Sequence, residues 1–155
     1  MSYHGLPVKQ LDKVAACVTT CSRQAPCPPV GDRNAQCYRA QCYATTRAVV
    51  AQLGLSSSQY TVSFQSRLGR LPWIQPYTDD IINQLYEQGV RDLVVACPAF
   101  VADCLETLEE IGLQLKEEWL QLGGNTLTLV PCLNADPLWA DALTQLLLRE
   151  CQSVE

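Results

Sequence analysis

The sequence predicts an α/β fold in three layers, a parallel sheet with helices on both faces. Short apolar segments that end at proline alternate with longer amphipathic segments that end at glycine along the 155-residue chain. Such alternation is typical of parallel strands joined by crossover helices. The run from Leu93 to Cys97 is apolar throughout, which favours a strand buried on both faces of the sheet.

Helices are expected wherever an amphipathic run has a capping residue before it or a glycine after it. The expected helices cover residues 38–53, 78–88 (or from Asp79), 102–122, and a last segment from Asp136 or Asp141 to about residue 151.

Strands are expected before and between these helices, at residues 60–64, 93–97 and 127–130, with a short one that ends at His4. Ligands of parallel α/β sheets gather beyond the carboxyl ends of the strands. His4 and the segments 65–67, 98–100 and 132–134 follow those ends, so we expect them to surround one crevice.

Length and composition indicate one domain over residues 1–155, with a cysteine-rich insert at 8–42. The net charge of −5 argues against a nucleic-acid partner, because phosphate binding needs a basic face. No apolar run approaches the ~20 residues of a membrane span, and Met1 leads into no signal segment. We therefore expect a cytoplasmic protein with no membrane span.

Four segments carry a resemblance to a known family. They are Ser2-Tyr3-His4-Gly5-Leu6-Pro7, Phe64-Gln65-Ser66-Arg67 with its continuation through Pro72-Trp73 to Thr78-Asp79, the run from Cys97-Pro98-Ala99-Phe100 to Leu105-Glu106-Thr107-Leu108, and Leu133-Asn134-Ala135-Asp136-Pro137. In order and spacing the chain resembles the carboxyl-terminal half of ferrochelatase. The resemblance implies a lyase of haem biosynthesis, which inserts ferrous iron into protoporphyrin IX.

The resemblance also implies roles for single residues. His4 matches the histidine that faces the porphyrin centre, as metal ligand or proton acceptor, and Glu106 matches the glutamate opposite it. Glu110 matches a second acidic position that passes metal or protons to the site. Trp73 matches an aromatic residue that packs near the macrocycle. Arg67 suits a porphyrin propionate, although a surface charge explains it equally well.

Metal insertion removes two pyrrole protons and delivers a divalent cation to the same place. A neutral imidazole accepts protons near pH 7, and a carboxylate binds cations or relays protons. Glu106 and Glu110 are four residues apart and Asp103 lies three before Glu106, so one helix face should carry all three. We expect this clustering to raise the pKa values of the carboxylates.

Nine cysteines are present, five of them within the first 42 residues. Cys21, Cys27, Cys37 and Cys42 supply the four thiolates that a [2Fe–2S] cluster or a structural zinc ion requires, and Cys17 is a substitute for Cys21. The insert resembles the one that carries a cluster in some bacterial ferrochelatases. The cysteine spacing is not that of a standard zinc-finger pair, which favours the cluster over zinc; a loop without metal remains open.

The resemblance implies a partner, because ferrochelatases form their porphyrin cleft between two α/β halves. Three explanations stay open: the chain pairs with a separate amino-terminal half chain, it is one half of an intact enzyme, or it forms a homodimer. Two other functions stay open: a non-catalytic iron–sulfur module, and a small homodimeric chelatase for another tetrapyrrole such as sirohydrochlorin.

Overall fold

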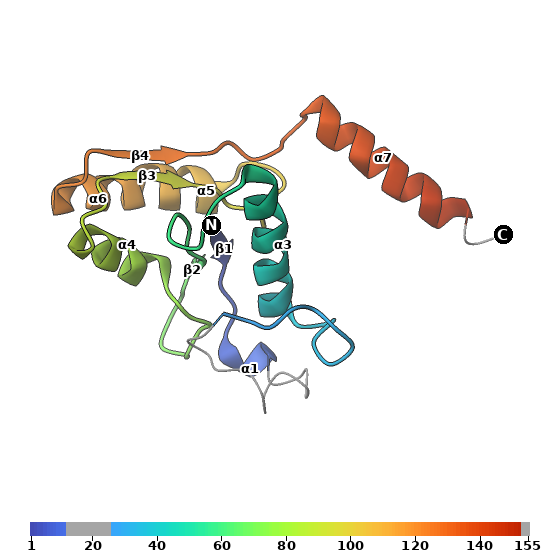
Figure 1. The fold of residues 1–155 in the computed structure, drawn as a ribbon, viewed down its shortest axis with the longest axis horizontal. Helices are drawn as coiled ribbons and strands as arrows, with labels where there is room; N and C mark the ends of the chain where they lie inside the picture. The colour runs from blue at the N-terminus through green and yellow to red at the C-terminus, as the bar shows by residue number, and fades with distance from the viewer. Residues whose placement is uncertain (12–25, 153–155) are drawn as a thin grey trace.

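Two pairs of parallel strands form the centre of the protein. The computed structural model describes residues 1–11 and 26–152. Strand β1 (Ser2–His4) pairs with β2 (Ser63–Gln65), and β3 (Asp92–Val95) pairs with β4 (Thr126–Leu129), both in parallel (Figure 1). The backbone N–H of Ser2 donates to the carbonyl of Ala96 at 2.9 Å. This bond brings β1 beside the end of β3.

Helices connect and flank the strands. They are α1 (Val8–Leu11), α3 (Tyr38–Leu53), α4 (Thr78–Glu87), α5 (Leu105–Leu108), the π-helix η1 (Glu110–Leu115), α6 (Lys116–Leu122) and α7 (Pro137–Gln152). The prediction of a mixed α/β fold with parallel strands is confirmed.

Most expected elements are present, with shifted ends. Helix α3 matches the expected 38–53, and Gly54 closes it with φ at 65°. The strand expected at 60–64 begins only at Ser63.

The helix expected over 102–122 starts at Leu105 and is divided by η1. The residues before Leu105 are not helical: the Asp103 carboxylate accepts a hydrogen bond from the Cys132 backbone N–H, and Cys104 is the N-cap of α5.

Two hydrophobic clusters stabilise the fold. One joins β1 and β2 to α3 and to the described end of the cysteine-rich segment, and includes Tyr3, Phe64 and Cys37. The other joins β3 and β4 to α4, η1 and α6 around Trp119, which is fully buried.

One prediction about β3 is wrong. Val95 is buried, but Val94, which points to the opposite face of the strand, is 72% exposed. Thr126 and Thr128 on β4 are exposed too. The outer face of the β3–β4 pair therefore has no helix over it in the described part of the chain. An apolar run is consistent with burial on both faces but does not require it.

Helix α7 extends away from the rest of the protein (Figure 1). Of its 16 residues none is buried. Among the described helices, no segment is both long and apolar enough to cross a membrane.

Candidate active site

His4 lies at the carboxyl end of β1, and its ring orientation follows from one hydrogen bond. The imidazole Nδ1 lies 2.6 Å from the carbonyl oxygen of Gly5. A carbonyl only accepts, so Nδ1 carries the hydrogen in the neutral ring. The lone pair is then on Nε2, which is the nitrogen left to accept a proton or to bind a metal ion.

Two aromatic side chains flank this imidazole. The ring centroids of Phe100 and Trp73 lie 6.0 and 6.4 Å from that of His4. Gly5 permits this packing: a Cβ atom there would lie 2.8 Å from the carbonyl oxygen of Gln65 and 3.1 Å from Cε3 of Trp73. Position 5 therefore has no room for a side chain larger than that of glycine, and glycine there lets the imidazole of His4 lie beside Trp73.

Glu106 lies in the first turn of α5, close enough to His4 for their charges to interact. Its pKa lies below the usual value, chiefly because the Cys104 side chain hydrogen-bonds to the carboxylate, with contributions from the Glu106 backbone N–H and from His4. Cys104 is also the N-cap of the helix and forms a capping box with Thr107. Glu106 is therefore anionic at neutral pH.

Asp103 connects the α5 segment to the loop after β4. Its carboxylate accepts hydrogen bonds from the Asn134 side chain at 2.7 Å and from the Cys132 backbone N–H at 3.2 Å. In return, Asn134 Oδ1 accepts from the Asp103 backbone N–H at 2.9 Å. These bonds lower the pKa of Asp103, the Asn134 bond most of all.

The expectation that clustered carboxylates raise one another's pKa values is wrong for Asp103 and Glu106, because hydrogen-bond donors that stabilise the charged form outweigh the repulsion.

Glu110 points to the end of β2 rather than into solvent. Its carboxylate accepts hydrogen bonds from the backbone N–H and the hydroxyl of Ser66, both at 2.6 Å, and from Gln65 Nε2 at 3.3 Å. The same Gln65 amide also donates to the backbone carbonyl of Glu106 at 2.5 Å. The side chain of Gln65 therefore connects the two glutamate positions to the sheet.

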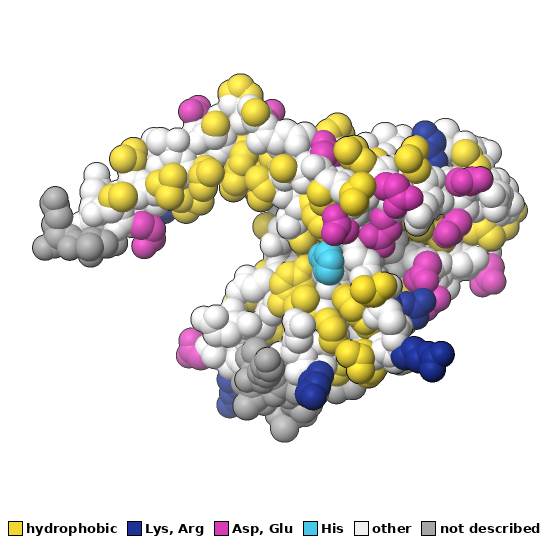
Figure 2. All heavy atoms as spheres, turned by 180° about the vertical axis from the view of Figure 1, so that it is seen from behind, with side chains coloured by type: hydrophobic (Ala, Val, Ile, Leu, Met, Phe, Trp, Pro, Cys, Tyr) yellow, Lys and Arg dark blue, Asp and Glu magenta, His cyan; other side chains and the backbone are white. Residues whose placement is uncertain are grey.

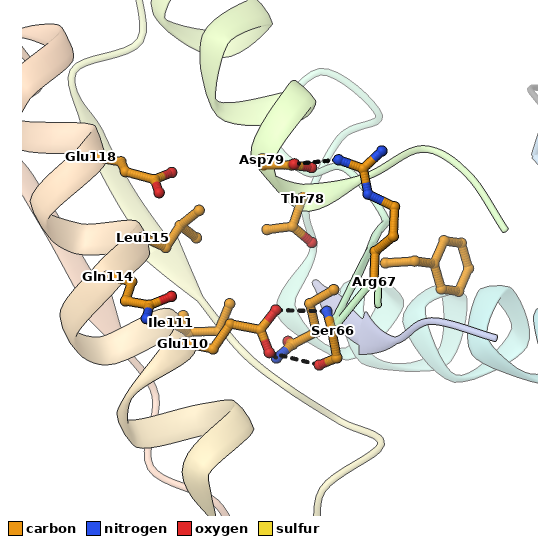
Figure 3. Close-up of a pocket in the computed structure, with 11 residues that line it drawn as sticks. Ser66, Arg67, Thr78, Asp79, Glu110, Ile111, Gln114, Leu115 and Glu118 are labelled. Atoms are coloured by element: carbon orange, nitrogen blue, oxygen red, sulfur yellow. Dashed lines mark hydrogen bonds and ion pairs between the residues drawn. The ribbon is translucent and has the colours of Figure 1, made fainter. Parts of the chain in front are cut away.

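A cavity of about 200 Å³ opens beside Glu110 (Figure 3). Two further carboxylates, Asp79 and Glu118, line it together with Thr78 and Gln114. Arg67 lies at its edge, where it forms an ion pair with Asp79 at 3.0 Å and places its guanidinium 4.2 Å from the ring centre of Tyr77. Of the two residues predicted to bind porphyrin, Arg67 forms an ion pair with Asp79 at the edge of this cavity, and Trp73 lies beside His4.

Three of the four proposed cluster cysteines lie in one place. Cys27, Cys37 and Cys42 are all buried in the same hydrophobic cluster. Burial raises the pKa of the Cys42 thiol to about 12, and the nearby Cys27 and Cys37 contribute. Cys17 and Cys21 lie outside the described residues. Among the described residues, no three His, Cys, Asp or Glu side chains are arranged to hold a metal ion.

Sequence reasoning missed the supporting residues of the site. Cys104 caps α5 and contacts Glu106, and Gln65 spans the two glutamate segments. A cysteine is a rare N-cap, so residue type gave no signal for it. The positions of Gln65 and Asn134 after strand ends did indicate the crevice, although not their partners.

Fold and site together define a class: a parallel α/β protein in which a histidine at a strand end lies beside two aromatic rings and near a carboxylate. A sequence model of the family described as ferrochelatase matches residues 1–151. The chain therefore belongs to the ferrochelatase family.

Curated relatives show how much of such a protein this chain represents. A ferrochelatase of Legionella pneumophila (strain Corby) is 51% identical over 142 residues, which cover 92% of this chain and 42% of that protein. A ferrochelatase of Coxiella burnetii (strain Dugway 5J108-111) is 47% identical over 151 residues, 97% of this chain and 43% of that protein. The chain thus spans less than half the length of these relatives.

Proposed function

We propose that this chain is the carboxyl-terminal half of a ferrochelatase, which inserts ferrous iron into protoporphyrin IX. The observation that carries the proposal is the position of His4 beside Trp73 and Phe100, near enough to Glu106 for their charges to interact, in a chain of this family. The aromatic rings offer a flat apolar surface for a macrocycle, and the imidazole and carboxylate supply the polar chemistry at its centre.

In this proposal His4 is the proton acceptor or the metal ligand at the porphyrin centre. Its Nδ1–H is held by the Gly5 carbonyl, so Nε2 is the reacting atom in either role. The Gly5 contact also fixes the plane of the ring, which limits the orientations from which a pyrrole proton is accepted.

In this proposal Glu106 attracts the ferrous ion, and Glu110 passes metal or protons to the site. The lowered pKa of Glu106 keeps it anionic, so it attracts the ferrous substrate and balances the charge of a protonated His4. Glu110 is held by Ser66 and Gln65 one turn further from the imidazole, at the cavity that Asp79 and Glu118 also line. We assign it the passage of metal or protons between this cavity and Glu106.

Trp73 packs against the macrocycle in this proposal, and Arg67 contacts a propionate only if it leaves Asp79. The other half of the cleft comes from a second polypeptide segment, which is either an amino-terminal half or a second copy. The proposed architecture is one sheet of β1–β4 with helices on both faces, and the proposed location is the cytoplasm.

The test is an iron-insertion assay with ferrous iron and protoporphyrin IX. We would assay the chain alone and after co-expression with the segment of the Legionella pneumophila ferrochelatase that lies outside the match. The proposal predicts haem formation by the assembled protein. An assembled protein that binds porphyrin but forms no haem would favour a non-catalytic module, and insertion into sirohydrochlorin by a homodimer would favour the other chelatase.

We also propose that Cys21, Cys27, Cys37 and Cys42 hold a [2Fe–2S] cluster with a structural role. Cys27, Cys37 and Cys42 share one buried cluster, but their thiols are not arranged to hold a metal ion in the described part of the chain, so the proposal rests on the number of thiolates in the insert. Absorbance of the anaerobically purified protein between roughly 300 and 600 nm tests the assignment. A colourless preparation with bound zinc would assign the cysteines to zinc instead.

A further inference from the structure

Gln65 is the last residue of β2, and its side chain lies between the sheet and the helical segment that carries both candidate glutamates. Only 3% of the residue is exposed. Its amide contacts Ser2 and Cys97 on the sheet side, and Glu106 and Glu110 on the helix side. One buried amide therefore joins the sheet to this segment.

The chemistry of these partners fixes the direction in which the amide points. The Glu106 carbonyl at 2.5 Å and the Glu110 carboxylate at 3.3 Å accept hydrogen bonds, so the two hydrogens of Nε2 point to them. The Ser2 hydroxyl at 2.7 Å and the Cys97 thiol at 3.5 Å both donate to Oε1. These bonds use the two donors and the two acceptor positions of the amide. Neither a carboxylate nor an apolar side chain of the same size makes this set of bonds.

The two helix-side contacts lie at the junction of α5 and η1. A helix leaves the carbonyls of its last four residues without partners inside the helix, and Glu106 is one of the four residues of α5. The Gln65 amide donates to that carbonyl and also to the side chain of Glu110, in the first turn of η1. The amide therefore fixes both glutamate positions relative to the end of β2.

The backbone of Gln65 is tied to the strand that carries the histidine. Its Cα lies opposite that of His4 in the register of β1 and β2, and its carbonyl accepts from the Gly5 N–H at 2.8 Å. A single residue is thus connected to His4 through its backbone and to both glutamates through its side chain.

Hydrogen bonds determine where the two carboxylates lie, because neither is buried in the core. Glu106 and Glu110 are both partly exposed, and Figure 2 shows acidic side chains gathered on the surface beside the histidine, the only one in the chain. Ser66 orients the Glu110 carboxylate (Figure 3). The Gln65 amide holds the backbone of Glu106, whose charge interacts with that of His4.

We propose that Gln65 is a positioning residue for metal insertion: its amide sets where Glu106 and Glu110 lie relative to His4. The inference rests on the proposed function for the roles of these three residues. Buried polar groups without partners are costly, so loss of the amide should displace the segment rather than leave the Glu106 carbonyl and the Ser2 hydroxyl unpaired. A misplacement of about 1 Å lowers an enzymatic rate by about 100-fold.

The test compares the two substrates of the proposed reaction in the assembled protein. Gln65→Met keeps the size of the side chain and removes the amide. We predict that kcat/KM for ferrous iron falls about 100-fold. The KM for protoporphyrin IX should stay at the wild-type value, because the aromatic rings proposed to hold the macrocycle flank His4. A smaller folded fraction alone would lower activity without such a difference between the substrates.

Thr46→Val is the matched control. Thr46 is 1% exposed and its hydroxyl bonds to that of Tyr3 at 2.7 Å, so this variant also loses a buried polar contact. It should be less stable and keep the wild-type kcat/KM for iron. Ser2→Ala keeps Gln65 and removes one donor that orients its amide, so kcat/KM for iron should fall less, by about three- to tenfold. This milder variant decides the question if Gln65→Met does not fold.

A wild-type kcat/KM for iron in Gln65→Met, or in Ser2→Ala where the first variant does not fold, would overturn the inference. So would an equal loss in Thr46→Val, or a parallel rise in the KM for porphyrin. A wild-type assembly that forms no haem would refute the proposed function alone. NMR then tests the inference: the backbone and carboxyl signals of Glu106 and Glu110 should shift in Gln65→Met and not in Thr46→Val, and unshifted signals would overturn it.

Discussion

At the residue scale, the candidate site is organised by donors that stabilise negative charge. Asp103, Glu106 and Glu110 each accept hydrogen bonds from neighbouring backbone or side chains. For Asp103 and Glu106 these donors lower the pKa, whereas repulsion between the carboxylates alone would raise it. The site is therefore suited to attracting a divalent cation.

The first prediction concerns the thiol beside Glu106. Replacement of Cys104 by alanine removes the largest influence on the Glu106 carboxylate, so the pKa of Glu106 should rise toward its usual value. Cys104→Ser keeps a donor and should retain most of the lowering. The measurement is an NMR titration of the Glu106 side-chain carboxyl. An unchanged pKa in the alanine variant would show that the thiol does not act on Glu106.

The second prediction concerns stability at low pH. The folded-state pKa of Asp103 lies below the usual 3.8, so its ionised form stabilises the fold above that value. The contribution is lost as pH falls through the lowered pKa. Asp103→Asn should therefore lower the free energy of unfolding near neutral pH and make its decline below about pH 4 shallower.

Urea unfolding at several pH values measures this effect. Asn134→Ala removes the main partner of Asp103 and should flatten the profile in the same direction. If both variants kept the wild-type slope, the Asp103–Asn134 contact would not contribute to acid sensitivity.

At the element scale, helix ends were predictable and strand limits were not. Gly54 and Gly89 both adopt positive φ at the ends of helices, as the sequence pattern indicated. Strand β2 is only three residues long, and its limits depend on tertiary contacts such as the Phe64 bond to the Pro76 carbonyl. The π-helix η1 could not be predicted from the spacing of the apolar residues, because one extra residue in a single turn leaves the overall pattern helical.

The third prediction tests the turn after β1. Gly5→Ala would place a Cβ against Gln65 and Trp73 and should cost about 1–3 kcal/mol of stability, because the backbone carbonyl cannot yield easily. Gly31→Ala is the matched control, since a Cβ there has no neighbour within 4 Å, and its effect should stay within about 0.5 kcal/mol. Chemical denaturation compares them. Equal stability of the two variants would mean that the Gly5 contact is not tight.

At the scale of the whole molecule, the family and the crevice were predictable from motif order, whereas the exposed surfaces were not. The segments after β1, β2 and β3 contact one another around His4, and the segment after β4 is joined to Asp103 by hydrogen bonds. Val94 and several leucines of α7 are exposed, although the apolar pattern of the sequence predicted burial for Val94. Periodicity indicates an apolar face but does not identify its partner.

The most direct test of the central proposal is the rate of iron insertion by the assembled protein when His4 is replaced by alanine. We predict a fall of about 10²–10⁴-fold, the usual size of a lost acid–base contribution, with porphyrin still bound. Leu53→Gln, at the exposed end of α3, should keep the wild-type rate. A His4→Ala protein that forms haem as fast as the wild type would contradict the account.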